Sequence, residues 1–497
     1  MLRRLLTPCR PRRLYSCSVR LCSNSGGNGT SDTPLSPEAI RELLQNSERE
    51  QQEKEMRVDQ RDVIFTSASS ADHRPRIAAA EAFDVAAAAL PRPPNFCYMN
   101  VSLDYAAMID APEVIWFNLC RANGLAPSSV KPQTLHMIGG AVCQQKLGGG
   151  YIQVVLGCIP DLESDVFTFD IIPEEADIKA DGRPPPAVCF SSLDTKLSLQ
   201  YERILSSHIG TLSQRLGPSC PVVGGLYPPI ADSSQHAESE SKEYQLDDSM
   251  FFVNDRVFKG SAIGIILRSK LLRGHSFSVV PSISLGAVTV KDVTCEDGVY
   301  TIPTIKDTTA TDYIKQLYMS DDLSSKPCKI FLGVSNSVGG KVPVSFIGDP
   351  KKGIIQFTLP GALTLKSGDT LDFLVDDAEL DTEAAASLLI SLEKEINPIC
   401  VEKDITIARE ARRNVVASSS AGFHFSHIGL NTIARPDASI INLGNSNAMF
   451  APSILQRCLG RSIPNGGFFS SGQVGSVNGV NAIFPRSSTY CVLEGLS

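Results

Sequence analysis

Residues 353–377 read GIIQFTLPGALTLKSGDTLDFLVDD and hold two short apolar segments separated by a turn rich in glycine and proline. Segments 353–359 and 370–375 have the length and the aliphatic and aromatic content of strands. An amphipathic helix is predicted to follow at 382–395 and to end at Asn397-Pro398, because the residue before proline disfavours helix. This stretch therefore predicts a fold in which strands and helices alternate.

The same alternation extends along most of the chain, with more strands than helices and short spacings between strands. This pattern predicts an α+β fold with two lobes of mixed, largely antiparallel sheets flanked by helices. A polar joint at 319–327 predicts lobes at 61–320 and 328–497. The predicted helices cover residues 76–90, 111–123, 201–216 and 309–317, and the predicted strands include 63–69, 96–101, 134–138, 151–158, 166–172, 250–254, 262–267, 277–280, 329–334, 342–347, 439–443, 467–470, 482–484 and 489–493.

The N-terminal 30 residues carry six arginines and several serines, with no acidic residue before Asp32. This composition predicts a mitochondrial transit peptide at 1–30, removed between about residues 21 and 32, and a location in the mitochondrial matrix. Arginines interrupt the apolar core that a secretory signal would need. Residues 31–60 are predicted to form a charged helix or linker that is either solvated or a docking element for a protein partner. No run of about 18 apolar residues occurs, so no membrane span is predicted.

The net charge and the cysteine pattern argue against nucleic-acid binding, disulfides and a zinc site. The net charge of −8 becomes more negative once the basic N-terminus is removed, so a broad nucleic-acid-binding face is not expected. The 14 cysteines form no CxxC pair, and most lie in apolar surroundings. Buried, reduced thiols are therefore expected in place of disulfides or a zinc site. No cofactor is predicted.

Motifs that would indicate catalysis fail on spacing. Gly339-Gly340-Lys341 has Ser335 where a phosphate-binding loop needs its first glycine, and no hydroxyl residue follows the lysine. Ser470-Ser471-Gly472 lacks the preceding glycine of a nucleophile elbow. His424 and His427 have no metal-ligand partners at suitable spacing. A hydrolase or transferase using Asp376, Asp377, His424 or a cysteine is the weakest hypothesis, and we expect that the chain is not an enzyme.

Glycine-rich turns joined to short apolar strands resemble those of the FIST family of signal-sensing domains, over residues 63–493. The resemblance is carried by AAAEAF at 78–83, MIGGAVCQ at 137–144, VVGGLY at 222–227, the opening stretch 353–377, CLGR at 458–461 and IPNGGFFSSGQVGSVNG at 463–479. It implies N-terminal and C-terminal FIST parts and a non-enzymatic, small-ligand-binding sensory module.

The resemblance also implies a binding site for a small polar ligand around the closing glycine-rich turn. Family members typically carry an acidic residue where this chain has Gln473, so an amino acid is expected to bind weakly. The alternative function is a structural or adaptor component of a large mitochondrial assembly, such as the mitochondrial ribosome or its maturation machinery. The candidate ligand-binding residues are Asn442, Asn445, Asn447, Arg461, Phe468, Gly472 and Gln473.

Overall fold

The structure is a computed structural model, and the chain divides into two compact units, Met1–Val58 and Asp59–Ser497. All described residues belong to the second unit. They are residues 62–103, 110–127, 134–142, 150–168, 182–217, 219–228, 249–279, 282–320, 330–335, 340–360, 363–375, 415, 417–427, 463–470, 472–477, 480–485 and 487–496.

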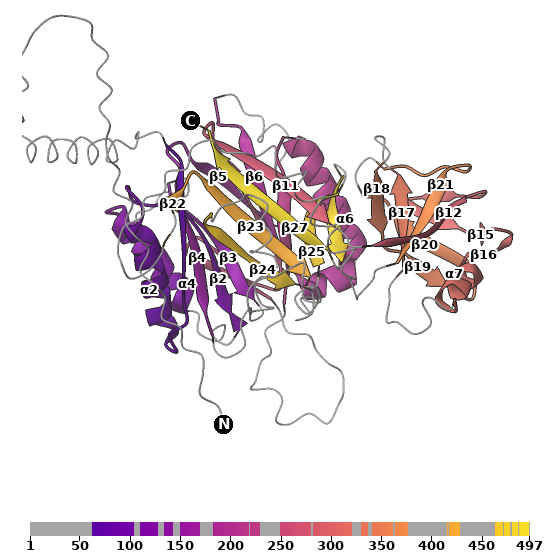
Figure 1. Ribbon diagram of the computed structural model, residues 1–497, viewed down its shortest axis with the longest axis horizontal. Helices are drawn as coiled ribbons and strands as arrows, with labels where there is room; N and C mark the ends of the chain where they lie inside the picture. The colour runs from indigo at the N-terminus through magenta and orange to yellow at the C-terminus, as the bar shows by residue number, and fades with distance from the viewer. Residues whose placement is uncertain are drawn as a thin grey trace, which may run out of the picture. The chain divides into compact units, whose positions relative to one another are not determined.

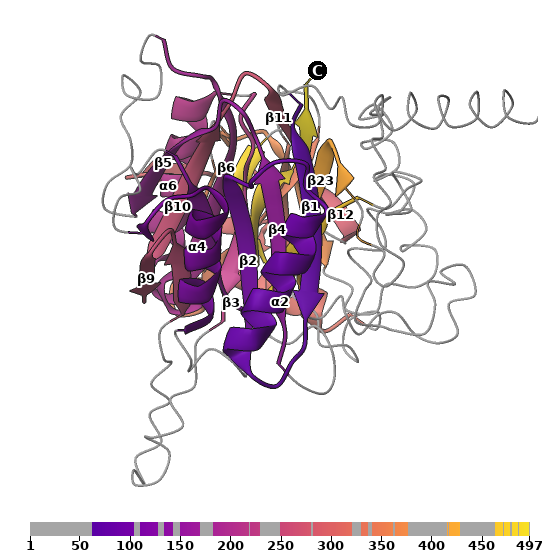
Figure 2. The same ribbon diagram turned by 90° about the vertical axis from the view of Figure 1, so that its left-hand side faces the viewer.

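A seven-stranded sheet comes first in the chain and carries helices α2 (Pro75–Ala88) and α4 (Asp110–Ala122). Figure 2 shows both helices in front of this sheet. Pro75 suits the first helical turn, and alanines at helical spacing let α2 pack closely on the strands. The sheet order is β22 (Ala417–Ser418), β1 (Ile64–Ser70), β4 (Ile152–Cys158), β2 (Phe96–Ser102), β3 (His136–Val142), β8 (Met250–Val253) and β9 (Arg256–Lys259).

Two further sheets share a core with the first, and the three sheets together form the larger lobe. The second sheet carries helix α6 (Thr195–Leu216), and one hydrophobic cluster joins buried residues of all three sheets. The second sheet runs β26 (Val480–Pro485), β25 (Gly472–Val477), β7 (Val222–Tyr227), β6 (Pro186–Asp194), β10 (Ala262–Arg268) and β5 (Glu163–Thr168). The third runs β11 (Leu272–Val279), β27 (Ser488–Gly495), β23 (Ser420–His427) and β24 (Asn465–Ser470).

A smaller lobe with its own hydrophobic core contains the described residues of the opening stretch, 353–360 and 363–375, and helix α7 (Ala310–Tyr318) (Figure 1). The two strands predicted there form, but they join different sheets. One sheet runs β12 (Ile283–Thr289), β21 (Thr370–Val375), β17 (Ile330–Ser335) and β18 (Lys341–Val344). The other runs β13 (Thr294–Glu296), β14 (Val299–Ile302), β20 (Ile354–Thr358) and β19 (Ile347–Asp349), beside the short pair β15 (Thr304–Ile305) and β16 (Thr308–Thr309).

The predicted class, α+β with mixed and largely antiparallel sheets flanked by helices, is confirmed. Strands from both sides of the polar joint at 319–327 nevertheless pair with each other. β12 pairs with β21 in the smaller lobe, and β11 pairs with the C-terminal strand β27 in the larger one. The larger lobe is therefore discontinuous in sequence, with the smaller lobe inserted between β11 and β22.

Several predicted segments lie outside the described residues: the presequence, the charged helix or linker, the helix at 382–395 and the strand at 439–443. Among the described cysteines, six are buried and Cys295 is exposed, and all seven are free thiols. No helix in the described ranges is long and apolar enough to cross a membrane.

Each of the three sheets of the larger lobe contains one parallel strand pair, and the remaining strand pairs among the described residues are antiparallel. The parallel pairs are β2 with β3, β6 with β7, and β23 with β24. Helix α4 connects the first pair and α6 connects the second. We call these units module 1 (β2, α4, β3), module 2 (β6, α6, β7) and module 3 (β23, β24).

A glycine stands at the same place in each module. Gly139, Gly224 and Gly467 face Met99, Ser191 and His424 across the parallel pair. A Cβ atom on these glycines would lie 1.8, 1.8 and 1.9 Å from the carbonyl oxygens of those partners. The sequences MIGGAV, VVGGLY and NGGFFS carry the shared pattern. The larger lobe thus repeats one strand-pair unit three times.

Candidate functional site

Equivalent residues of the three modules meet at the centre of the larger lobe. Tyr98, Phe190 and Phe423 each precede the residue that faces the module glycine. Their ring centroids are 5.8 Å apart for Tyr98 and Phe190, and 5.1 Å apart for each pair that includes Phe423. Such distances suit tilted and edge-to-face aromatic packing. The three modules therefore surround a common point.

The next inward-facing positions are Asn100, Ser192 and Phe425, which are again equivalent. Asn100 is fully buried, and its Nδ2 donates a hydrogen bond to the carbonyl oxygen of Gly467 at 2.8 Å. This bond ties module 1 to module 3. Together with the aromatic side chains beside them, these residues form what we call the central cluster: Tyr98, Asn100, Phe190, Ser192, Tyr227, Phe423, Phe425 and Phe468.

The central cluster has hydrogen-bonding groups that are neutral at physiological pH. Burial raises the pKa of Tyr98 well above its usual value, and the nearby Tyr227 adds to this effect. Burial also raises the pKa of Tyr227 to about 12, although Tyr98 and Ser192 beside it act in the opposite direction. General acid–base catalysis works best with a group that titrates near the operating pH. The tyrosines of the central cluster therefore stay protonated at neutral pH and do not act as catalytic bases there.

Gly140 and Gly225 have no side chain, and aromatic rings of the central cluster occupy the space where a side chain would lie. A Cβ atom on Gly140 would lie 2.4 Å from Cε1 of Tyr227, and one on Gly225 would lie 2.9 Å from Cζ of Phe468. The rings of Tyr227 and Phe468 have centroids 4.2 Å apart. Close backbone approach to these rings therefore requires glycine.

Three of the sequence-predicted ligand residues are described, and all three are buried. Phe468 belongs to the central cluster, and Gly472 begins strand β25. Gln473 is buried, and its Nε2 donates to the carbonyl oxygen and the hydroxyl of Ser470 at 3.2 and 3.1 Å. Its Oε1 accepts from the backbone N–H and the hydroxyl of Ser487 at 3.0 and 2.8 Å. Asn442, Asn445, Asn447 and Arg461 lie outside the described residues.

Sequence reasoning missed Asn100, Ser192 and the two tyrosines of the central cluster. The available signal was the recurrence of a Gly-Gly pair in a short apolar segment, with Gly139, Gly224 and Gly467 in equivalent places within 138–140, 223–225 and 466–468. Aligning the three modules on it places Asn100, Ser192 and Phe425 at one position.

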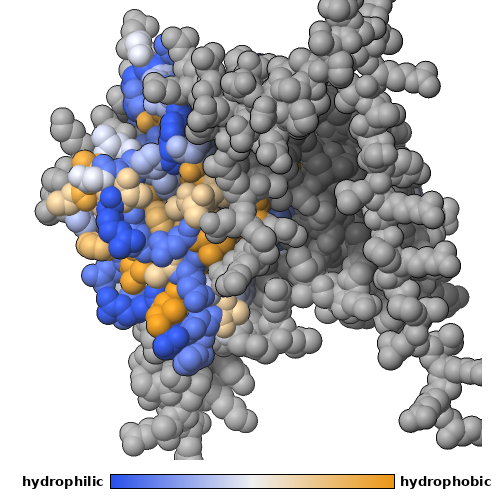
Figure 3. Space-filling model, turned by 60° about the vertical axis from the view of Figure 1, so that its left-hand side comes forward, coloured by the Kyte–Doolittle hydropathy of each residue, from blue (hydrophilic) through white to orange (hydrophobic). Residues whose placement is uncertain are grey.

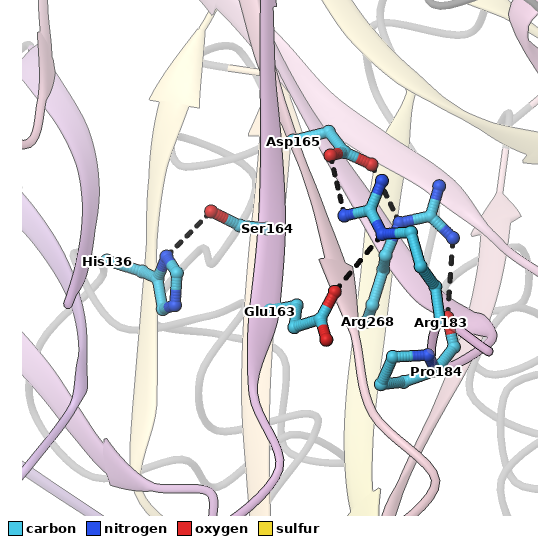
Figure 4. A network of polar contacts seen from close by, with 7 residues as sticks. All are labelled: His136, Glu163, Ser164, Asp165, Arg183, Pro184 and Arg268. Atoms are coloured by element: carbon cyan, nitrogen blue, oxygen red, sulfur yellow. Dashed lines mark hydrogen bonds and ion pairs between the residues drawn. The ribbon is translucent and has the colours of Figure 1, made fainter. Parts of the chain in front are cut away.

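A second polar constellation joins strand β5 to its neighbours (Figure 4). On one side of β5, Ser164 Oγ lies 2.6 Å from Nδ1 of His136, and both residues are buried. This resembles a nucleophile and its base, but an enzyme's nucleophile must be reached by substrate, and this pair is enclosed between β3 and β5. We interpret it as a contact between the first and second sheets.

On the other side of β5, two acids and two arginines form an ion-pair network (Figure 4). Arg268 Nε lies 2.7 Å from Asp165 Oδ2, and its side chain is only 1% exposed. Arg183 contacts Asp165 at 2.8 Å and Glu163 at 3.1 Å. The opposite charges balance one another, which is what a structural network requires.

His424, a sequence-level candidate for metal binding, is buried in β23, and burial lowers its pKa to about 4. No group of three or more potential ligand side chains that could hold a metal ion occurs among the described residues. His424 occupies the position of Met99 and Ser191 in the other modules.

We expect acid to destabilise the fold through His424. Its folded-state pKa of about 4 lies below its ordinary value of 6.5, so the unfolded chain binds the proton more tightly. Stability should therefore fall as the pH decreases from about 6.5 to 4, by about 3 kcal/mol for this residue. Urea unfolding across this range should show a shallower pH dependence for His424→Met, which installs the residue of module 1. Equal slopes for both proteins would contradict the assignment.

No model of a known protein family matches the chain, and no curated protein matches it. Among solved structures, a crystal structure of cyanuric acid hydrolase from A. caulinodans is similar, with a TM-score of 0.30 and 9% sequence identity. The similarity covers 88% of this chain and 100% of that chain. At so low a TM-score the likeness supports no inference about this protein.

Proposed function

We propose that the protein is a non-enzymatic structural or adaptor component of a large mitochondrial assembly. The observation that carries this proposal is that Gln473 is buried and forms its hydrogen bonds inside the protein. Its Nε2 atom donates to Ser470 and its Oε1 atom accepts from Ser487. No polar group of this side chain is therefore directed toward a ligand. The described candidate side chains, Phe468 and Gln473, are buried, and this supports a role that is carried by the surface of the protein.

Surface and sequence features support an adaptor role. Phe117 on α4 is 52% exposed, and Met319 and Ile347 in the smaller lobe are 66% and 61% exposed. On the face shown in Figure 3, apolar patches lie between hydrophilic ones. Exposed aromatic and aliphatic side chains are common anchors of protein interfaces. The arginine-rich residues 1–30 are the basis for placing the protein in the mitochondrial matrix.

The likeness to FIST domains gives the second candidate, a sensory module that binds a small polar ligand through Arg461 and the segment 442–447. One feature of the central cluster favours it. Asn100 Oδ1 is buried and accepts no hydrogen bond within the described part of the chain. A buried acceptor of this kind is the sort of group that an ordered guest satisfies.

Gln473→Glu distinguishes the two functions. We expect this substitution to lower stability by about 1–3 kcal/mol, because a carboxylate cannot donate to the Ser470 carbonyl oxygen and would be buried. Thermal unfolding should show no added stabilisation by amino acids. Gln356→Glu is the matched control, since Gln356 is only half-buried and donates to Thr301 at 3.4 Å. Micromolar stabilisation of the wild type by an amino acid, lost in Arg461→Ala, would favour the sensor and overturn the adaptor role.

The apparent size of the native protein tests whether it belongs to a large assembly. Under native conditions, the protein from mitochondrial extracts should migrate in a fraction of about a megadalton. Migration wholly as a monomer or dimer under conditions that keep known large complexes intact would contradict the proposed role.

A further inference from the structure

We infer that the ring of Phe468 occupies a ligand-sized site at the centre of the larger lobe, and that its removal produces a binding site for a small aromatic alcohol. This inference stands independently of the adaptor role, because it concerns the interior of the protein and not its surface.

The environment of Phe468 is built from the module repeat. Its ring lies 4.2 Å from that of Tyr227 and 5.5 Å from that of Phe425, in an edge-to-face arrangement with the latter. Its tip faces Gly225, whose missing side chain provides the room. The preceding residue, Gly467, accepts the hydrogen bond from Asn100. Phe468 is therefore enclosed by groups from all three modules.

Comparison of the modules shows why this ring is the occupant. Gly140, Gly225 and Phe468 are equivalent, since they face Asn100, Ser192 and Phe425 across the three parallel pairs. Two modules have glycine there, with the rings of Tyr227 and Phe468 packed against the glycines, and the third module supplies a benzyl group. Glycine in the third module would leave a cavity of the size of that ring. Enclosed apolar cavities of about 150 Å³ in other proteins stay dry and bind benzene.

The polar groups beside the site favour a guest with a hydroxyl. Ser192 pairs with Gly225, which faces the ring tip, and Asn100 Oδ1 accepts no hydrogen bond within the described residues. Tyr227 contributes a neutral hydroxyl to the same cluster. A phenol hydroxyl can therefore find buried partners that benzene cannot use, and an unmet hydrogen bond in a buried site is costly.

The test is thermal unfolding of full-length Phe468→Gly and Phe468→Ala with phenol and with benzene. Phenol should raise the Tm of both variants by about 2 °C or more at ten times its dissociation constant. Benzene should stabilise them less, and the wild type should not respond. Phe357→Ala is the control, because Phe357 is buried against Tyr300 in the core of the smaller lobe.

Two further results decide the inference. Adding Ser192→Ala to Phe468→Ala should reduce the advantage of phenol over benzene. If neither single variant folds alone, refolding in the presence of phenol should recover soluble protein. A lack of response to phenol in folded variants, a lack of rescue in unfolded ones, or an equal response of Phe357→Ala would overturn the inference and leave the adaptor role untouched.

Discussion

Replacing Gly467 with alanine is expected to prevent the chain from reaching its native fold. The new Cβ atom would lie 1.9 Å from the carbonyl oxygen of His424 and 2.7 Å from its carbonyl carbon. Both are backbone atoms in the adjoining strand β23, so no side-chain rotation relieves the overlap. The φ angle of +128° adds strain for any residue with a Cβ. Moving β24 away would also break the Asn100 bond to Gly467.

The expected loss in Gly467→Ala can be compared with the total free energy of unfolding. Domains are stable by about 5–15 kcal/mol, and separating two paired central strands affects a large share of that. Gly286→Ala is the matched control, because Gly286 has a φ of +121° but no heavy atom within 4 Å of its Cβ position. The control should lose about 1–2 kcal/mol from backbone strain alone.

Circular dichroism, soluble yield and urea unfolding measure the difference between the two variants. Gly139→Ala should behave like Gly467→Ala, since its Cβ would lie 1.8 Å from the Met99 carbonyl oxygen without a positive φ. A Gly467→Ala protein that unfolds at the same urea concentration as Gly286→Ala would show that the module glycines are not required for close strand approach.

Local pattern was enough to predict the elements that pack on one face. The helices expected at 76–90 and 111–123 are observed as α2 (Pro75–Ala88) and α4 (Asp110–Ala122). Their apolar residues recur at helical spacing, and proline marks the start or end of each segment, so short-range information defines them.

Strand β23 was missed because its sequence carries little strand signal. It reads SAGFHFSH, in which small and polar residues alternate with a few aromatics. Its partners are β27 and β24, which lie far along the chain, and the sheet they form buries even His424 and Ser426. Tertiary pairing, and not local propensity, makes this segment a central strand.

Only part of the candidate site could be predicted from the sequence. Phe468 was identified from its glycine-rich turn, and it belongs to the central cluster. Asn100 lies 367 residues earlier than its partner Gly467, so only alignment of the modules could have brought them together. The hydrogen bonds of the Gln473 amide depend on Ser470, the last residue of β24, and on Ser487, and no spacing rule connects these residues.

Asp165→Asn should destabilise the larger lobe by about 3 kcal/mol, because it leaves Arg268 buried beside a neutral group. Asp165 is the carboxylate nearest Arg268 in the network and also contacts Arg183, so one substitution weakens both pairs. Its own side chain is 23% exposed, which places the expected loss at the lower end of the range for buried pairs.

Glu163→Gln provides the matched control on the same strand. The Glu163 side chain is 36% exposed and contacts Arg183, which is 25% exposed, so water screens this pair more strongly. Its loss should cost roughly 0–1 kcal/mol. Urea unfolding of both variants at neutral pH measures the difference directly.

Removing the buried cation should recover part of the stability lost in Asp165→Asn. In the double variant Asp165→Asn with Arg268→Met, no uncompensated charge remains at position 268, and the methionine side chain fills much of the same space. The double variant should therefore be more stable than Asp165→Asn alone, since contacting residues do not contribute additively. Equal losses for Asp165→Asn and Glu163→Gln, or a further loss in the double variant, would mean that the buried charge of Arg268 does not govern the network and that its carbon chain and its hydrogen bond to the Pro184 carbonyl oxygen matter more.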